Sequence, residues 1–168
     1  MTPLEEPTIE PATPADVETI ADQWVRLARG QRGHGSHVLA DGNRETMRAT
    51  LAAHRLDGGL LVARLDGDVV GFASFTLERG ALELDATRGV LSNLYVDPGH
   101  RGRGIGSALL GAVEDALVER GADVLALEVL ADNEAARRFY RREGYEPYRV
   151  AMQRRLPREN DTHSKEDG

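Results

Sequence analysis

The fifteen residues from Val96 to Leu110, VDPGHRGRGIGSALL, join an apolar strand pattern to an apolar helix pattern through four glycines and two arginines. Glycine at the start of a helix loses extra backbone entropy and contributes no side chain to pack. Such a turn lets main-chain N–H groups approach a phosphate closely, and the N-terminus of the following helix adds a partial positive charge. The stretch therefore favours a phosphate-binding turn over a plain glycine-rich one.

Two common phosphate-binding motifs do not fit this stretch. The P-loop ends in Gly-Lys-Ser/Thr, which is absent here. The dinucleotide fingerprint G-x-G-x-x-G fails because, counted from Gly104, its third glycine position is occupied by Leu109. The pattern that remains is R-x-x-G-x-G, from Arg101 to Gly106.

Length and composition indicate one globular domain. The chain has 168 residues, of which 40% are hydrophobic, and we expect a single domain over residues 8–156 with flexible tails at 1–7 and 157–168. No apolar run reaches the ~18 residues of a membrane span, and the acidic, proline-containing N-terminus resembles no targeting peptide. The chain has no cysteine, which excludes disulfides, thiolate zinc sites and a cysteine nucleophile. A cytoplasmic location is expected.

The charge of the chain argues against nucleic acid as a partner. The formal net charge is -7, whereas nucleic-acid binding needs a basic surface. Lys165 is the only lysine among 21 basic residues. An arginine-rich, acidic composition fits a halophilic protein in a salty cytoplasm, and it fits equally the codon usage of a GC-rich genome.

Hydrophobic periodicity predicts the order of the elements. A short strand begins at Thr8, and a helix capped by Thr13 or Asp16 follows it; a second helix covers Arg44 to Leu56. An antiparallel meander comes next, in which Asp66-Gly67 forms a two-residue hairpin turn. The remaining expected elements are a strand over 89–96, a helix from Ile105 that ends at Gly121, a strand over 124–130, a helix over 133–142 that ends at Gly144, and a strand or hairpin over 145–156.

This order describes a mixed α/β domain, or α+β by the pairing of its strands, with a mostly antiparallel central sheet.

Two blocks of the C-terminal half resemble a known family. LYVDPGHRGRGIGSALL resembles the acetyl-coenzyme A signature of GNAT-type N-acetyltransferases, in which hydrophobic-x-V-x-P-x-x-R-G-x-G-I-G ends a strand and starts the pyrophosphate-binding helix. LEVLADNEAARRFYRREGYEP resembles the family segment L-x-V-x-x-x-N-x-x-A-x-x-F-Y-x-x-x-G-F, with Tyr145 in place of the usual phenylalanine. The two blocks cover roughly Leu91 to Tyr148. The resemblance implies the GNAT (acyl-CoA N-acyltransferase) fold, with a splay in the sheet beside the cofactor strand.

The resemblance also implies a site for acetyl-CoA as co-substrate. Main-chain groups of Leu94, Tyr95 and Val96 would bind the pantetheine arm, Asn133 would contact the same region, and Tyr140 would be the general acid. The second of the two blocks, residues 127–147, is called the LEV block here after its first three residues. It resembles the ribosomal-protein alanine N-acetyltransferase subgroup, in which the glutamate at the position of Glu128 acts as base. The residues whose main-chain amides would hold the pyrophosphate are Arg101, Gly102, Arg103, Gly104, Ile105, Gly106 and Ser107.

Each of these side chains also has a purely structural interpretation. Asn133 sits where a helix begins, so it is suited to capping that helix. Tyr140 could be a packing residue, although it lies seven residues after Asn133, two turns along the same helix face. Glu128 alternates with apolar neighbours in a strand pattern and could be an ordinary solvated carboxylate.

The expected reaction is direct acetyl transfer to a primary amine, because no cysteine can carry an acyl group. The acceptor stays open among a protein N-terminus, a lysine and a small amine, since the N-terminal half has no recognisable motif. The alternative is a sensor module that binds acyl-CoA without turnover. No metal site is expected beside His34 and His37, because a third ligand is lacking. We expect no membrane partner and a monomer or homodimer.

Overall fold

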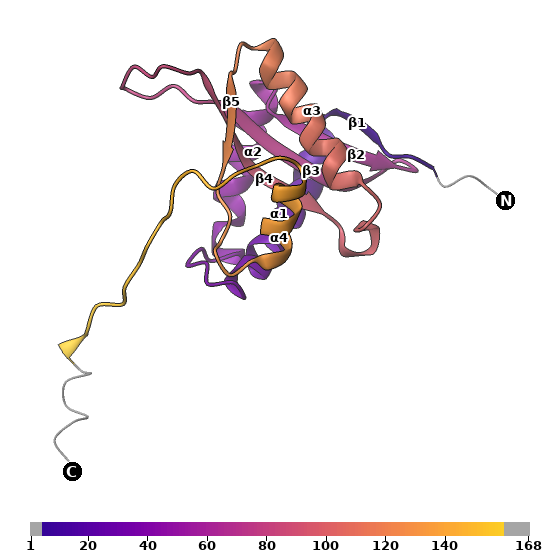
Figure 1. Cartoon of the computed structure of the whole chain (residues 1–168). Helices are drawn as coiled ribbons and strands as arrows, with labels where there is room; N and C mark the ends of the chain where they lie inside the picture. The colour runs from indigo at the N-terminus through magenta and orange to yellow at the C-terminus, as the bar shows by residue number, and fades with distance from the viewer. Residues whose placement is uncertain (1–4, 160–168) are drawn as a thin grey trace.

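The computed structural model describes residues 5–159, which form a five-stranded sheet with helices on both faces (Figure 1). The strand order is β1-β2-β3-β4-β5; neighbouring strands are antiparallel except β4 and β5, which are parallel. The mixed, mostly antiparallel sheet expected from the sequence is confirmed. The strands are β1 Thr8–Pro11, β2 Leu60–Leu65, β3 Asp68–Leu77, β4 Arg88–Val96 and β5 Val124–Leu127, and the α-helices are α1 Val17–Arg32, α2 Arg44–Leu56, α3 Ile105–Glu119 and α4 Glu134–Arg142.

The sheet separates two hydrophobic clusters. On one face α1 and α2 pack against Phe72 and Tyr95, and Ile20 and Leu51 are completely buried there. On the other face α3 packs through Leu109 and neighbouring residues, and α4 adds partly buried aromatic rings to this cluster. Helices therefore cover both faces of the sheet, and α3 and α4 lie together on one of them.

The predicted turns and helix ends are confirmed. Asp66 and Gly67 both have positive φ, 51° and 82°, as a type I′ hairpin turn requires. Gly121 follows the C-cap of α3 with φ 87°, and the N–H of Ala122 donates to the carbonyl of Leu117 at 2.9 Å. Gly144 takes the same left-handed conformation after α4.

The Thr13 and Asp16 side chains mark the start of α1 together. The Asp16 carboxylate accepts hydrogen bonds from the N–H of Thr13 at 2.8 Å and from its hydroxyl at 3.0 Å. Asp16 is buried, and its charge is balanced by Arg64 of β2, whose Nη2 lies 2.8 Å from Oδ2 of Asp16. This ion pair connects the start of the first helix to β2.

The prediction of a strand or hairpin over 145–156 is wrong for this structure. No strand occurs between α4 and residue 159, and the segment runs away from the body of the domain instead of along it (Figure 1). A strand needs a hydrogen-bonded neighbour, and among residues 5–159 the segment has no main-chain partner of this kind. The strand expected over 124–130 is also shorter, since β5 ends at Leu127, where its pairing with β4 ends.

The predicted flexible tails fall largely outside the described residues, which exclude 1–4 and 160–168. Across residues 5–159, no helix combines the length and apolar character needed to cross a membrane.

Candidate active site

The sheet opens beside the second half of β4. Pairing between β4 and β5 begins at Arg88 and Val124 and stops at Leu91 and Leu127. β4 continues over residues 92–96 with β3 on one side, and within residues 5–159 no strand lies on its other side. The register between β3 and β4 shifts at Ser92, which forms a bulge. A bulge increases local twist and bends a strand, so it accounts for the divergence of β4 from β5.

The register determines which main-chain groups face this opening. The N–H of Asp97 donates to the carbonyl of Val70 at 2.8 Å, and hydrogen-bonded pairs alternate with non-bonded pairs along an antiparallel ladder. Tyr95 therefore turns its main-chain groups toward β3, while Leu94 and Val96 turn theirs toward the opening. In agreement, Nε of Arg101 reaches the carbonyl oxygen of Val96 at 3.0 Å from that side. Of the three residues expected to offer main-chain groups, Leu94 and Val96 face the opening, and the carbonyl of Val96 is already bonded by Arg101.

The glycine-rich turn leads from this opening into α3 with its amides unused. No acceptor within residues 5–159 bonds the main-chain N–H groups of residues 102–107, and the first helical bond runs from Ala108 to Gly104. Gly102 and Gly104 have φ of 77° and 81°, in the left-handed region that glycine adopts readily. The N-cap position is Gly104, which has no side chain to cap the helix. Consecutive free amides at a helix N-terminus suit a phosphate group.

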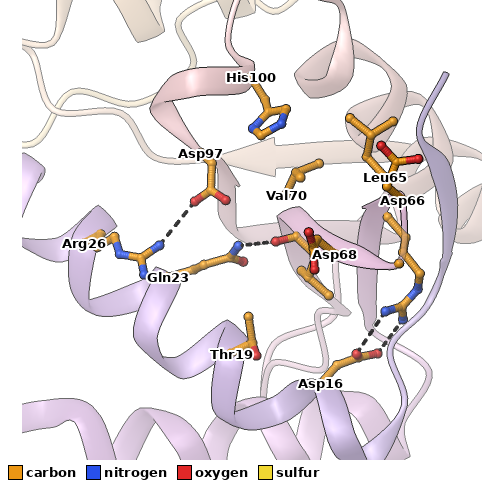
Figure 2. A pocket seen from close by; sticks show the side chains of 13 residues that line it. Asp16, Thr19, Gln23, Arg26, Leu65, Asp66, Asp68, Val70, Asp97 and His100 are labelled. Atoms are coloured by element: carbon orange, nitrogen blue, oxygen red, sulfur yellow. Dashed lines mark hydrogen bonds and ion pairs between the residues drawn. The ribbon is translucent and has the colours of Figure 1, made fainter. Parts of the chain in front are cut away.

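The turn is anchored from the α1 side of the sheet. Figure 2 shows Arg26 of α1 directed toward Asp97, with Nη1 and Oδ1 3.3 Å apart. The hydroxyl of Tyr95 donates to the same carboxylate oxygen at 3.0 Å. Asp97, Arg26 and His100 line a cavity of about 470 Å³ between α1, the β2–β3 turn and the start of the glycine-rich turn. These contacts hold the turn from the face opposite α3.

Two side chains of the turn contact other parts of the domain, and a third does not. The guanidinium of Arg101 lies over the ring of Tyr95, 5.9 Å from its centroid. The hydroxyl of Ser107 donates to Oε1 of Glu143 in α4 at 2.6 Å. Arg103 is exposed, and it has no interaction partner within residues 5–159.

Tyr140 of α4 lies half-buried in an aromatic cluster. Its ring meets those of Phe139 and Tyr145 edge-on, at centroid distances of 5.0 and 5.9 Å. Burial raises the pKa of Tyr140 to about 12. Its hydroxyl forms no hydrogen bond to another described residue. The group is therefore a protonated donor without an acceptor among residues 5–159.

The two remaining predicted side chains occupy different settings. Oδ1 of Asn133 accepts from the N–H of Ala136 at 3.2 Å, so the capping interpretation is confirmed. Glu128 follows the last residue of β5, is exposed, and forms no ion pair or hydrogen bond within the described part of the chain. Leu125 and Leu127 belong to the α3 cluster, so strand alternation directs Glu128 to the opposite, α1–α2 face.

The family follows from this arrangement together with the sequence. Residues 21–145 match the acetyltransferase (GNAT) family. The chain belongs to the GNAT family.

Three proteins show how far the similarity of this GNAT chain extends. A mycothiol acetyltransferase from Beutenbergia cavernae is 34% identical over 141 residues, which cover 83% of this chain and 46% of that protein. The chain thus spans less than half the length of this relative. A GCN5-related N-acetyltransferase from Ralstonia eutropha JMP134 has a TM-score of 0.72 at 25% identity, over 89% of this chain and 98% of that one.

The third is an aminoglycoside N-acetyltransferase in complex with CoA, with a TM-score of 0.70 at 18% identity, over 92% of this chain and 99% of that one. At this identity the likeness shows the fold alone. None of these three proteins is named as a ribosomal-protein alanine N-acetyltransferase, the subgroup that the LEV block resembles.

One polar pair in this GNAT chain escaped the sequence analysis. Ser74 of β3 is fully buried, and its Oγ accepts from Nδ2 of Asn93 in β4 at 2.9 Å, directly beside the Ser92 bulge. The available signal was a serine inside the apolar run FASF and an asparagine inside a strand pattern. The pair lies on the α1–α2 face, since Phe72 and Tyr95 on the same two strands belong to that cluster.

The loop that contains His34 and His37 contacts the C-terminal segment through His37. His37 contacts Oε1 of Gln153 through Nε2 at 2.8 Å. In the described part of the chain, no group of His, Asp and Glu side chains is arranged to hold a metal ion.

Proposed function

We propose that this GNAT-family chain transfers the acetyl group of acetyl-CoA directly to a primary amine in a ternary complex. The single observation that supports this most is the continuity of the open β4 edge with the free amides of residues 102–107. A pantetheine arm carries amides that pair with a strand edge, and it is joined to a pyrophosphate that suits a helix N-terminus.

The binding residues are proposed from this geometry and from the family pattern. Leu94 and Val96 offer main-chain groups to the pantetheine arm, and the amides from Arg101 to Ser107 hold the pyrophosphate. Asn133 has its Oδ1 committed to the helix cap, which leaves its Nδ2 as a donor toward the same arm.

The chemistry then requires two proton transfers by this chain. Acetyl-CoA supplies a thioester carbonyl, which only a neutral amine attacks, and free amines have pKa values of ~8 to ~10. Glu128, on the α1–α2 face and free of ion pairs with described residues, accepts the amine proton directly or through water. A main-chain N–H on the open β4 edge stabilises the developing oxyanion.

Tyr140 completes the cycle from the other face of the sheet. A pKa of about 12 keeps its hydroxyl protonated, whereas a thiol has a reference pKa of ~8.5. The tyrosine therefore holds a proton through the neutral range and donates it to the departing thiolate. The absence of cysteine from the chain supports direct transfer without a thioester on the protein.

The acceptor is proposed only as a class. The mycothiol acetyltransferase relative favours a small amine, and the LEV block favours a protein N-terminus, with lysine as a third member of the class. We also propose a cytoplasmic location, and the acidic, lysine-poor composition makes salt concentration a necessary variable in any assay.

The decisive experiment combines binding and turnover. Acetyl-CoA at one hundred times its Kd should stabilise the native chain by about 2.7 kcal/mol, seen as a rise in Tm, whereas NADH and ATP should have far smaller effects. Release of free thiol is then followed with a panel of amines at low and high salt. An unmoved Tm at both salt concentrations contradicts acetyl-CoA binding. A raised Tm without thiol release from any amine instead supports the acyl-CoA sensor.

A further inference from the structure

A cavity of about 470 Å³ lies beside the start of the glycine-rich turn and takes no part in the proposed reaction. Its walls come from α1, from the β2–β3 turn and from the residues that follow β4 (Figure 2). Neither residues 102–107 nor Glu128 line it, so it is separate from the proposed acetyl-CoA site. Its volume falls within the range of about 300–1,000 Å³ that is usual for small-molecule pockets.

The Gln23 side chain holds a buried acceptor in this cavity. Figure 2 shows Gln23 extending from α1 into the space; it is 1% exposed, and its Nε2 donates to the carbonyl of Val69 at 2.9 Å. Its Oε1 is buried and accepts no hydrogen bond within residues 5–159. Nδ1 of His100, in the same cavity, is also buried and unbonded there. Buried polar atoms are nearly always satisfied, so the Oε1 of Gln23 indicates a ligand that donates hydrogen bonds.

The charge of the cavity is negative. Each arginine in its walls is already paired with an aspartate of the same walls, Arg64 with Asp16 and Arg26 with Asp97. Oδ1 of Asp97 accepts from both Arg26 and the Tyr95 hydroxyl, which leaves its Oδ2 unbonded among residues 5–159. The charged residues that line the cavity are Asp16, Asp66, Asp68, Asp97, Arg26 and Arg64. A surface with this balance attracts cations.

Two carboxylates at the β2–β3 turn add to this negative charge. Glu5 and Asp66 lie within hydrogen-bond distance of each other, and this contact, together with the negative charge of Asp66, raises the pKa of Glu5 above its usual value. Asp68, two residues further on, has no ion pair or hydrogen bond to another described side chain. Like charges that gather in this way favour an opposite charge beside them.

The type of cation follows from the acceptors. Across residues 5–159, no group of His, Asp and Glu side chains is arranged to hold a metal ion. Gln23 Oε1 and Asp97 Oδ2 are instead acceptors for N–H groups. We propose that this cavity binds a small organic cation whose head group carries several N–H donors, a guanidinium or a primary ammonium, and that the bound cation strengthens acetyl-CoA binding.

The link to acetyl-CoA runs through Asp97. This residue directly precedes the 3₁₀ turn Pro98–His100, which leads into the glycine-rich turn. A cation beside the Asp97 carboxylate reduces the negative charge near the unbonded amides of residues 102–107, where the pyrophosphate is proposed to bind. This part of the inference rests on the proposed function, whereas binding of the cation does not.

The first test uses methylguanidinium, whose protonated head group donates N–H bonds and has no lone pair to attack a thioester. It is titrated calorimetrically into the full chain without acetyl-CoA, at fixed low ionic strength because salt screens charge attraction. We expect saturable binding at one site. Tetramethylammonium has the same charge without N–H donors, and should bind about tenfold more weakly or worse, since charge-assisted hydrogen bonds are lost. Equal binding of the two cations, or no saturation with methylguanidinium, would overturn the proposal.

A parallel titration with methylammonium distinguishes the two head groups. Both probes donate N–H bonds, and the one that binds more tightly identifies the head group that the cavity takes.

Matched variants test the place of binding. Asp68→Asn should weaken methylguanidinium binding about fivefold or more, because it removes one charge from the wall; its fold should survive because the side chain is exposed. Asp85→Asn is the control, since it removes the same charge from an exposed position in the β3–β4 loop, and it should bind as the wild type does. Equal weakening by the two variants would show general attraction to an acidic surface and overturn the site.

Gln23→Met tests the buried acceptor itself. Methionine keeps the length of the side chain but removes Oε1, so the preference for methylguanidinium over tetramethylammonium should be lost. A preference that persists in the folded variant would contradict the role of Gln23. The Tm of the variant is measured alongside, and if the variant does not fold, the comparison of Asp68→Asn with Asp85→Asn decides.

The last test measures the coupling. Acetyl-CoA is titrated into the chain with and without saturating methylguanidinium, and its Kd should fall about fivefold or more, the lower end of typical allosteric coupling. By reciprocity, acetyl-CoA should tighten methylguanidinium binding by the same factor. An unchanged Kd for acetyl-CoA would overturn the coupling. A chain that binds methylguanidinium at one site but binds no acetyl-CoA would contradict the proposed function and support the cation site.

Discussion

Phe139 of α4 packs directly over Gly106 in the first turn of α3. A Cβ built on Gly106 would lie 3.5 Å from Cζ of Phe139 and 3.9 Å from Cγ2 of Val96. The absence of a side chain on Gly106 thus lets α4 approach both the start of α3 and the end of β4. Because Tyr140 is the next residue after Phe139, this contact also sets the position of the proposed acid.

Substitution of Gly106 should therefore separate a tolerated change from a disruptive one. Alanine places its Cβ at ordinary contact distance, and a methyl group added at such a distance should change stability by less than ~0.6 kcal/mol. Gly106→Ala should therefore retain acetyl-CoA affinity and kcat within about threefold, a factor that corresponds to this energy. Leucine would displace Phe139, and overpacking of this kind typically costs about 1–3 kcal/mol. Gly106→Leu should lower both Tm and kcat. Equal activity of the two variants would show that α4 does not need this close approach.

Gly104 allows a prediction based on backbone conformation instead of contact. Nothing lies within 4 Å of a Cβ at this position, but its φ is 81°. A β-branched residue is strained in that region, by roughly 1–2 kcal/mol, and it would turn the neighbouring amides away from the phosphate position. Gly104→Val should therefore weaken acetyl-CoA binding about tenfold in a calorimetric titration, since each ~1.4 kcal/mol is a factor of ten.

Gly99 provides the matched control in the same turn. A Cβ there also has open space, and its φ is not positive. Gly99→Val should therefore bind acetyl-CoA as the wild type does. If both variants bind equally well, the left-handed backbone of Gly104 is not required for the site.

The ion pair between Asp16 and Arg64 should control stability in acid. Burial raises the pKa of Asp16, but hydrogen bonds from Arg64 and Thr13 outweigh this, so that the pKa lies below its usual 3.8. A carboxylate with a depressed folded pKa contributes stability that is complete above the unfolded pKa. That contribution is lost as the pH falls through the lower, folded value. Stability from Asp16 should thus be constant near neutrality and decline below about pH 4.

Arg64→Met tests this assignment. It leaves the buried Asp16 carboxylate without its cation, and an unpaired buried charged group lowers the free energy of unfolding by about 3 kcal/mol. The free energy of unfolding at pH 7, measured by urea titration, should fall by about that amount, and its decline in acid should become shallower. Arg29→Met is the control, because Arg29 pairs with Asp41 at the exposed surface and should change stability by less than about 1 kcal/mol. Equal losses in the two variants would contradict a special role for the Asp16 pair.

Local signals in the sequence predicted most elements, because helix periodicity and turn residues act over a few positions. The α3 helix, its end at Gly121 and the Asp66-Gly67 turn are of this kind. The bulge at Ser92 could not be predicted, because it exists only in the pairing of β4 with β3. That bulge determines which main-chain groups face the open β4 edge. Whether Tyr95 faces this edge or β3 therefore could not be decided from the sequence without the strand register.

The C-terminal segment shows the opposite failure. Its apolar side chains alternate with polar or small ones at Tyr148, Val150 and Met152, yet no strand forms there, because a pattern specifies a face to be covered and not the neighbour that covers it. The role of Glu128 stays a prediction: the residue is exposed and lies directly after the last residue of β5.

Tyr140→Phe distinguishes an enzyme from a sensor. The hydroxyl has a pKa of about 12, so it holds its proton across the neutral range, and donation by one positioned acid typically contributes about 10²–10⁴-fold. The variant should lower kcat by a factor in that range in a thiol-release assay. Acetyl-CoA affinity should change little, because the ring and its contacts with Phe139 and Tyr145 are retained. Tyr145→Phe is the control: it removes the hydroxyl from the neighbouring ring and should leave kcat within about threefold, because only the positioned acid carries the factor cited above.

The leaving group and the pH provide the sharper readout for the same variant. A thioester whose thiol has a lower pKa needs less protonation of its departing thiolate, so the deficit of Tyr140→Phe should shrink with such a substrate. In the wild type, the raised pKa should keep kcat free of a loss from Tyr140 ionisation up to about pH 10, near the reference value for tyrosine. A variant with near-wild-type kcat would make Tyr140 a packing residue. Loss of acetyl-CoA affinity in parallel with rate would instead assign its hydroxyl to binding, since the change would then act on the ground state and the transition state alike.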